Sequence, residues 1–286
     1  MKIILGTWPM SGDFGKYNKE ESIKLLKYCY RKGYREFDVA PNYGFGKSEE
    51  ILGEVFYNKD VLINTKIGNN SKKKKSFSVR FLEKSFYQSL DRLKKRSVNI
   101  LFVHNPRRIR NIDKIISFLK RLKKAKLINE YGLSVSKDYE YNKIIFNKFK
   151  TLQVDYNLIY QKLHFEKKYA NKKIYCRSTL ASGLLNNKRY NKFVESDQRK
   201  IWLKPKRLEN IYKFIDEFKI IKNYSIKELA LLFLKKSKFS NNVIFGCRNL
   251  KQFKQIEKVV NSKKNLTIDE FKLINKIYLE KNENHY

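Results

Sequence analysis

The sequence predicts a closed (β/α)8 barrel, the TIM-barrel fold, as a single domain over residues 1–286. Short apolar segments of β type alternate with longer amphipathic segments along the whole chain, which is typical of a parallel sheet covered by helices. Eight such segments occur, the number that closes a barrel. No internal repeat or low-complexity linker divides the chain. A doubly wound sheet is the alternative, but the turn after the first strand, Gly6-Thr7-Trp8-Pro9, lacks the glycine fingerprint of that fold.

The expected strands are short and rich in Ile, Leu, Val and Phe, as buried parallel strands are. They span approximately residues 3–7, 35–39, 61–66, 99–104, 130–134, 151–154, 173–177 and 242–245.

The expected helices carry apolar residues at helical spacing. Gly33 is expected to end the first helix, and Ser48 to cap the second. The expected helices cover approximately residues 19–32, 78–95, 112–124, 139–149, 165–169, 208–219, 226–236, 250–260 and 268–279, and the helix that Ser48 caps is expected to bury Ile51, Leu52 and Val55.

Cysteine content and hydropathy indicate the compartment. The three cysteines, Cys29, Cys176 and Cys247, are widely spaced and odd in number, which argues against a disulfide framework and against a cysteine zinc site. No run of about 18 apolar residues occurs, and the N-terminus lacks the features of a signal peptide. We therefore expect a reduced, cytoplasmic protein without a membrane span and without a metal.

The formal net charge is +36, from 64 basic and 28 acidic residues. Nucleic-acid binding is the direct functional interpretation of such a charge. However, 50 of the basic residues are Lys and only 14 are Arg. Arg is better suited to bind phosphates and bases, because its guanidinium group forms bidentate hydrogen bonds. Asn, Ile, Tyr and Phe, which share A/T-rich codons with Lys, are also abundant. We favour compositional bias over dedicated nucleic-acid binding.

Four ionisable residues, Asp38, Tyr43, Lys66 and His104, stand at or just after the ends of neighbouring strands. In a parallel barrel these ends meet at one face, so we expect the four side chains to converge. Together they suit carbonyl reduction, in which the substrate oxygen gains negative charge and a proton. Tyr43 can donate the proton, Lys66 can lower the pKa of the phenol, and Asp38 can hold Lys66. His104 can orient the carbonyl by a hydrogen bond.

These segments and several later ones resemble the aldo-keto reductase family over nearly the whole chain. The segments that carry the resemblance are Asp38-Val39-Ala40-Pro41-Asn42-Tyr43-Gly44 with Gly46, Ser48-Glu49 and Leu52-Gly53; Thr65-Lys66; His104-Asn105-Pro106; Gly132-Leu133-Ser134; Gln153-Val154-Asp155-Tyr156-Asn157; Arg177 to Leu185; and Gly246-Cys247-Arg248 with Gln252.

The resemblance implies an NADPH-dependent reductase of an aldehyde or ketone, with catalytic residues Asp38, Tyr43, Lys66 and His104. Ser134 and Gln153 would hold the nicotinamide carboxamide, and Arg248 the 2′-phosphate. Trp8, Phe45, Trp202 and His104 could line the substrate pocket, although core packing explains the aromatic residues equally well. The implied cofactor-binding residues are Gly6, Thr7, Asp38, Ser134, Gln153, Arg177, Ser178, Leu180, Ser182, Gly246, Arg248 and Gln252.

The sequence departs from the family pattern in four places. The first strand begins almost at residue 1, without the hairpin that closes the barrel floor in most relatives. Arg177 stands where many relatives place an aromatic residue under the nicotinamide ring. Val135 stands directly after Ser134, and Ile256 stands four residues after Gln252, at two positions where relatives often have Asn.

Two basic loops, Lys72–Lys75 and Arg107, Arg108 and Arg110, follow the third and fourth strands. We hypothesise that they attract an anionic substrate such as a phosphorylated or nucleotide-linked sugar; solvated loops are the alternative. A second functional hypothesis is a catalytically weak NADPH-binding regulatory or partner-binding module. A monomer is expected from the resemblance.

Overall fold

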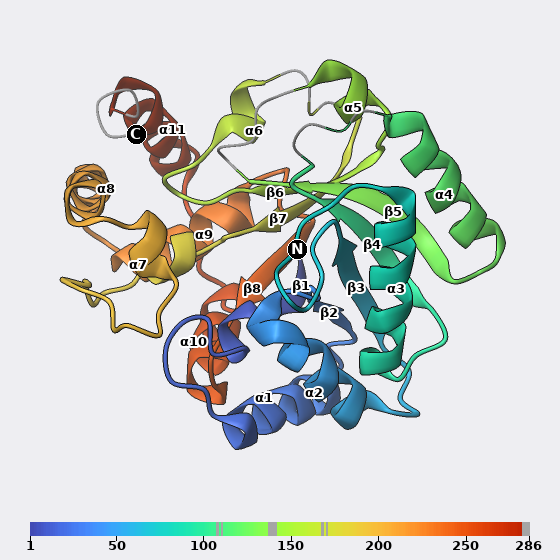
Figure 1. Cartoon of the computed structure of the whole chain (residues 1–286). Coiled ribbons are helices and arrows are strands. Elements are labelled where there is room, and N and C mark those ends of the chain that lie inside the picture. Colours follow the sequence, from blue (N-terminus) through green and yellow to red (C-terminus); the bar gives the residue numbers. More distant parts are fainter. Residues whose placement is uncertain (107–108, 110, 137–141, 167–168, 170, 282–286) are drawn as a thin grey trace.

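The computed structural model describes residues 1–106, 109, 111–136, 142–166, 169 and 171–281. Its eight strands form a closed barrel in which every strand pairs in parallel with its neighbours in sequence order, and β8 pairs with β1 (Figure 1). The predicted fold class is therefore confirmed. The strands are β1 Lys2–Gly6, β2 Glu36–Asp38, β3 Leu62–Ile67, β4 Val98–His104, β5 Ile128–Val135, β6 Thr151–Asp155, β7 Lys173–Arg177 and β8 Asn242–Gly246.

The helices lie outside the ring of strands (Figure 1). They are α1 Lys19–Arg31, α2 Lys47–Phe56, α3 Val79–Leu93, α4 Ile112–Lys124, α5 Lys143–Asn147, α6 Lys162–Phe165, α7 Arg199–Trp202, α8 Pro205–Glu217, α9 Ile226–Lys236, α10 Leu250–Val260 and α11 Ile268–Lys281. α5 is shorter than predicted, and part of the predicted span lies outside the described residues. α6 ends at Phe165, where its predicted span begins, and residues 167 and 168 of that span lie outside the described residues. α7 was not predicted because it is a single turn.

Strand alternation explains why the site residues share one layer inside the barrel. Successive side chains of a strand point to opposite faces, so every second residue faces the barrel axis. Asp38, Lys66, His104 and Arg177 are each the last inward residue of their strand, so all four lie at the C-terminal end of the parallel barrel. Polar side chains therefore form the last inward layer.

Below this polar layer the barrel interior is apolar. Ile4, Ile100, Phe102, Tyr175 and Ile244 form a buried cluster of inward side chains. Gly132 makes room for this cluster, since a Cβ there would lie 2.7 Å from the ring of Phe102.

The floor of the barrel is closed by polar side chains. Lys2, at the start of β1, forms a salt bridge of 2.5 Å with the buried carboxylate of Glu36. Asn64 donates to Glu36 at 2.6 Å, and Asn99 donates to Asn64 at 2.8 Å. This network links four neighbouring strands at the end of the barrel where the sequence predicts no covering hairpin.

Helix α2 is fastened to its surroundings by Glu49 and Gly53. The fully buried Glu49 forms a 2.7 Å salt bridge with Arg92 of α3 and accepts a 2.8 Å hydrogen bond from Thr65 of β3. Ser48 is not the N-cap that the sequence predicts; Gly46 precedes the helix at φ +94°, and the Ser48 hydroxyl donates to the Thr7 carbonyl at 3.3 Å. The loop after β1 is thereby joined to α2.

We expect Gly53→Ala to destabilise the protein by about 2 kcal/mol, because a Cβ at Gly53 would lie 2.2 Å from the Arg92 carbonyl oxygen. Urea denaturation measures the change in the free energy of unfolding. Glu50→Ala, at an exposed position of the same helix, is the control and should stay within about 0.5 kcal/mol of the wild type. Equal stability of the two variants would contradict the close α2–α3 packing.

Candidate active site

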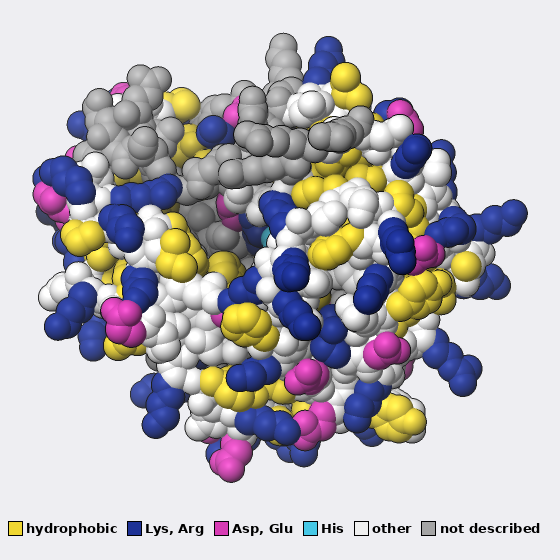
Figure 2. Space-filling model, viewed as in Figure 1, with side chains coloured by type: hydrophobic (Ala, Val, Ile, Leu, Met, Phe, Trp, Pro, Cys, Tyr) yellow, Lys and Arg dark blue, Asp and Glu magenta, His cyan; other side chains and the backbone are white. Residues whose placement is uncertain are grey.

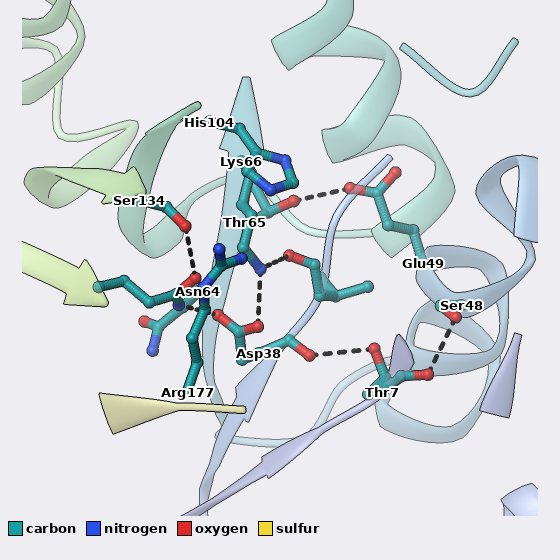
Figure 3. A network of polar contacts seen from close by, with 12 residues as sticks. Thr7, Asp38, Ser48, Glu49, Asn64, Thr65, Lys66, His104, Ser134 and Arg177 are labelled. Carbon is teal, nitrogen blue, oxygen red and sulfur yellow. Dashed lines mark hydrogen bonds and ion pairs between the residues drawn. The ribbon is translucent and has the colours of Figure 1, made fainter. Parts of the chain in front are cut away.

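A buried ion pair forms the centre of the candidate site. The Lys66 ammonium lies 2.6 Å from Asp38 Oδ1 and donates to the Val39 carbonyl at 2.9 Å (Figure 3). The Lys66 side chain is only 1% exposed. A buried ammonium is stable only when it is paired and hydrogen-bonded, and both partners come from the end of β2 and the residue that follows it, beside β3.

A chain of buried side chains supports the other oxygen of Asp38. Gln153 Nε2 of β6 donates to Asp38 Oδ2 at 2.6 Å. Ser134 Oγ of β5 in turn donates to Gln153 Oε1 at 2.8 Å (Figure 3). Both residues are fully buried. They therefore fix the carboxylate, and through it the ammonium, from across the barrel.

Tyr43 lies in the turn after β2, with its ring 5.0 Å from the Lys66 ammonium. Trp8 stacks on it at a centroid distance of 5.4 Å. Burial raises the pKa of Tyr43, although Lys66 and Arg177 oppose this shift. Lys66 lowers the pKa of Tyr43, as expected from the sequence, but desolvation outweighs the ammonium and the net direction is upward. Tyr43 is protonated at neutral pH and can donate.

His104, at the end of β4, is neutral at pH 7. Burial, and secondarily the charges of Lys66 and Arg177, lower its pKa well below the usual 6.5. Asn69 Nδ2 lies 3.4 Å from His104 Nδ1. Because an amide nitrogen only donates, Nδ1 accepts and Nε2 carries the proton. The neutral ring can therefore donate a hydrogen bond from Nε2.

Two cavities meet at these residues. The first, which we call the groove, runs between the ends of β1, β7 and β8 and holds about 1080 Å³ of free space, including its part open to solvent. The predicted cofactor residues that line it are Gly6, Asp38, Arg177, Ser178, Leu180, Ser182, Gly246, Arg248 and Gln252. Thr7, Ser134 and Gln153 are buried behind its wall, where Thr7 Oγ1 donates to the Asp38 carbonyl at 3.0 Å.

The second cavity, which we call the substrate cavity, lies on the other side of Tyr43. Of the residues predicted for the substrate pocket, Trp8, His104 and Trp202 line this cavity. Phe45 lines neither cavity: it is 62% exposed, and the Lys73 ammonium lies over its ring at 4.4 Å. Its backbone φ of +60° turns the side chain outward, which the residue type alone does not reveal.

The loop between β7 and α8, over residues 178–204, supplies three groove residues that the sequence did not reveal: Asn186, Tyr190 and Arg199. Its Asp197 pairs with Phe14 in a β-bridge, and the Gln198 amide donates to the Asp13 carbonyl at 2.8 Å. The Asp13 carboxylate also accepts from Trp8 Nε1 and from the Gly44 amide, both at 3.0 Å. The loop thus closes over the groove. No local sequence signal marks such a contact between distant loops.

Surface charge is distributed widely. Figure 2 shows Lys and Arg side chains spread over the whole visible face, with acidic side chains between them. Of the predicted basic loops, Lys73 pairs with Asp13 at 3.0 Å, whereas Lys75 lines the substrate cavity. Arg107, Arg108 and Arg110 lie outside the described residues.

The described residues offer neither a metal site nor a membrane-spanning helix. They contain no cluster of three or more His, Cys, Asp or Glu side chains able to bind a metal ion. No helix among them has both the length and the apolar character that a membrane crossing requires.

Comparison with known proteins identifies this barrel as an oxidoreductase. The aldo/keto reductase family model matches residues 2–279. The uncharacterized oxidoreductase YqkF of Bacillus subtilis is 24% identical over 275 residues, 90% of this chain and 87% of that protein. The aldo-keto reductase YhdN of the same organism is 32% identical over 142 residues, but the match spans only 43% of its length.

Solved structures show the same fold. Glycerol dehydrogenase AKR11B4 from Gluconobacter oxydans superposes with a TM-score of 0.75 at 22% identity, covering 98% of this chain and 92% of that one. Aldo-keto reductase AKR11C1 from Bacillus halodurans gives a TM-score of 0.72 at 18% identity, covering 96% and 91%. The chain belongs to the aldo/keto reductase family of NAD(P)H-dependent oxidoreductases.

We expect His104 to remain unprotonated between pH 8 and about pH 6. NMR of the imidazole Hε1 signal, assigned by its loss in His104→Gln, measures this. The unfolded chain protonates near the ordinary pKa of 6.5, while the folded chain resists protonation. The contribution of His104 to stability is therefore complete above about pH 6.5 and is lost as the pH falls below it. A signal that titrates near 6.5 would contradict the buried, neutral ring.

Proposed function

We propose that this protein reduces an aldehyde or ketone with NADPH, using Tyr43 as the proton donor. The observation that carries the proposal is the buried Lys66–Asp38 pair beside Tyr43, at the point where the groove and the substrate cavity meet. In the overall reaction a carbonyl compound, NADPH and a proton give an alcohol and NADP⁺.

The chain's own residues would handle the proton and the developing charge. NADPH, when bound, supplies the hydride that attacks the carbonyl carbon. Tyr43 gives its phenolic proton to the carbonyl oxygen, and the nearby Lys66 ammonium stabilises the phenolate that forms. Asp38 keeps the ammonium in place. Its bond to Gln153 limits the movement of the pair during turnover.

His104 would orient the substrate. Its neutral ring presents Nε2–H, and the ring lines the substrate cavity. A hydrogen bond from Nε2 to the carbonyl oxygen strengthens as that oxygen gains charge. The low pKa of His104 makes it a hydrogen-bond donor at pH 7 rather than a competing source of protons.

The groove fits a dinucleotide phosphate. Its end distant from Tyr43 is lined by two cations, Arg248 and Lys227 of α9, together with Gln252. Arg248 is held in place, because its guanidinium donates to the Lys16 carbonyl at 2.9 Å and its amide donates to Gln252 at 2.8 Å. Two cations at this end favour the 2′-phosphate of NADPH over the plain ribose of NADH. Ser134 and Gln153, buried behind the wall, fit a supporting role better than a direct carboxamide contact.

The charge of the substrate cavity favours an anionic carbonyl compound. Lys75, Arg177 and Arg207 line the cavity, against the single carboxylate of Asp155 among its described wall residues. Trp202, Leu203 and Ile211 add an apolar side. A phosphorylated or carboxylated sugar would match an excess of positive charge beside a flat apolar wall.

Tyr43→Phe should lower carbonyl reduction at least 1000-fold, because the phenyl ring keeps the packing and removes the proton donor. NADPH consumption measures turnover, and fluorescence titration should show NADPH binding within about threefold of the wild type. Undiminished turnover would remove the acid assignment. A wild-type protein that binds NADPH but reduces no aldehyde in a broad panel would favour the regulatory-module hypothesis.

Arg207→Met should lower the preference for anionic substrates about fivefold. The measure is the ratio of kcat/KM for 4-carboxybenzaldehyde to that for 4-methylbenzaldehyde, and the wild-type ratio should also fall with added salt. Lys206→Met is the matched control, because it removes the same charge from an exposed neighbour that lines neither cavity. Equal salt dependence for both aldehydes would count against an anionic substrate.

A further inference from the structure

Arg177 lines both the groove and the substrate cavity. The residues that line both of them are Trp8, Tyr43, Arg177, Ser178 and Ser182. Arg177 is the charged residue of this shared wall, within the described part of the chain. Its side chain is 16% exposed, so water screens its charge only partly.

The positive end of Arg177 faces the catalytic residues. In its ion pair with Asp155, Arg177 Nε lies 3.2 Å from Asp155 Oδ1. The closest contact is therefore at the base of the guanidinium group. Ser178 holds the same Asp155 oxygen with a 2.6 Å hydrogen bond. Figure 3 shows the Arg177 side chain rising from β7 toward the network around Lys66 and Asp38. Its charge lowers the pKa of both Tyr43 and His104.

The reaction places a second charge at this junction. Hydride and proton go to the two adjacent atoms of one carbonyl group, so the hydride donor has to be held beside Tyr43. The nicotinamide ring carries a positive charge when it is oxidised and none when it is reduced. A guanidinium group at the junction therefore repels one form and not the other.

We propose that Arg177 makes the groove discriminate between the two oxidation states of the dinucleotide, so that NADP⁺ binds more weakly than NADPH. This inference rests on the proposed function. The discrimination leaves the overall equilibrium unchanged but weakens inhibition by the product NADP⁺, which favours repeated reduction. The sequence shows only that Arg177 stands where many relatives have an aromatic residue. The structure places the Arg177 charge where the two cavities meet, and there it acts on the charge of the bound dinucleotide.

The test compares the dissociation constants of NADP⁺ and NADPH by fluorescence titration or calorimetry, without any carbonyl substrate. Their ratio, Kd(NADP⁺)/Kd(NADPH), cancels contributions from the phosphates and the adenosine. Arg177→Met should lower the ratio about tenfold, the size expected for two charges several ångströms apart that Asp155 partly offsets. Arg177→Lys keeps the charge and should keep most of the ratio.

Two further variants separate the charge from a general disturbance. Asp155→Asn removes the counter-ion and should raise the ratio. Arg207→Met removes a cation that lines only the substrate cavity and should leave the ratio unchanged.

A ratio that stays within twofold of the wild type in both Arg177→Met and Asp155→Asn would overturn the inference while leaving the proposed reduction intact. Failure of the wild type to bind either dinucleotide would instead overturn the proposed function, and this inference with it.

Discussion

The rest of the candidate site depends on the buried ammonium of Lys66. A charge that is removed from water in the middle of a barrel needs a counter-ion and further hydrogen bonds, or it loses its proton. Asp38 and the Val39 carbonyl bind the ammonium directly. Gln153 donates to Asp38, and Ser134 donates to Gln153, so these two residues support the ammonium indirectly. The need to stabilise this one charge thus holds side chains from four strands in place. Tyr43 and His104 pack against this network.

Burial and positive charge act differently on the two proposed hydrogen donors. Desolvation favours the uncharged form of each group, so it keeps Tyr43 protonated and His104 neutral. The charges of Lys66 and Arg177 lower both pKa values. They therefore oppose the effect of burial on the pKa of Tyr43 and reinforce it on the pKa of His104. Both side chains therefore present an N–H or O–H at neutral pH. The same cations give the junction of the two cavities a positive field, which acts on whatever charge a ligand brings there.

Much of the fold and part of the site could be predicted from the sequence. Alternating apolar segments gave all eight strands, and Asp38, Lys66 and His104 stood at strand ends where a parallel barrel must bring them together. The positions of Phe45, Thr7, Ser134 and Gln153 could not be predicted, since exposure depends on backbone turns and on neighbours. Asp13, Lys227 and residues 186–199 carried no local signal, because their partners are distant in the sequence.

The sequence by itself determined the barrel, its family and the identity of the four chemical groups, because strand periodicity and residue type are local properties of the chain. Only the tertiary structure decided the net direction of the Tyr43 pKa, the outward position of Phe45 and the place of Arg177 between two cavities. These properties depend on burial and on charges from several strands at once. Desolvation and Coulomb interactions are set by distances in space, which neighbours in sequence do not reveal.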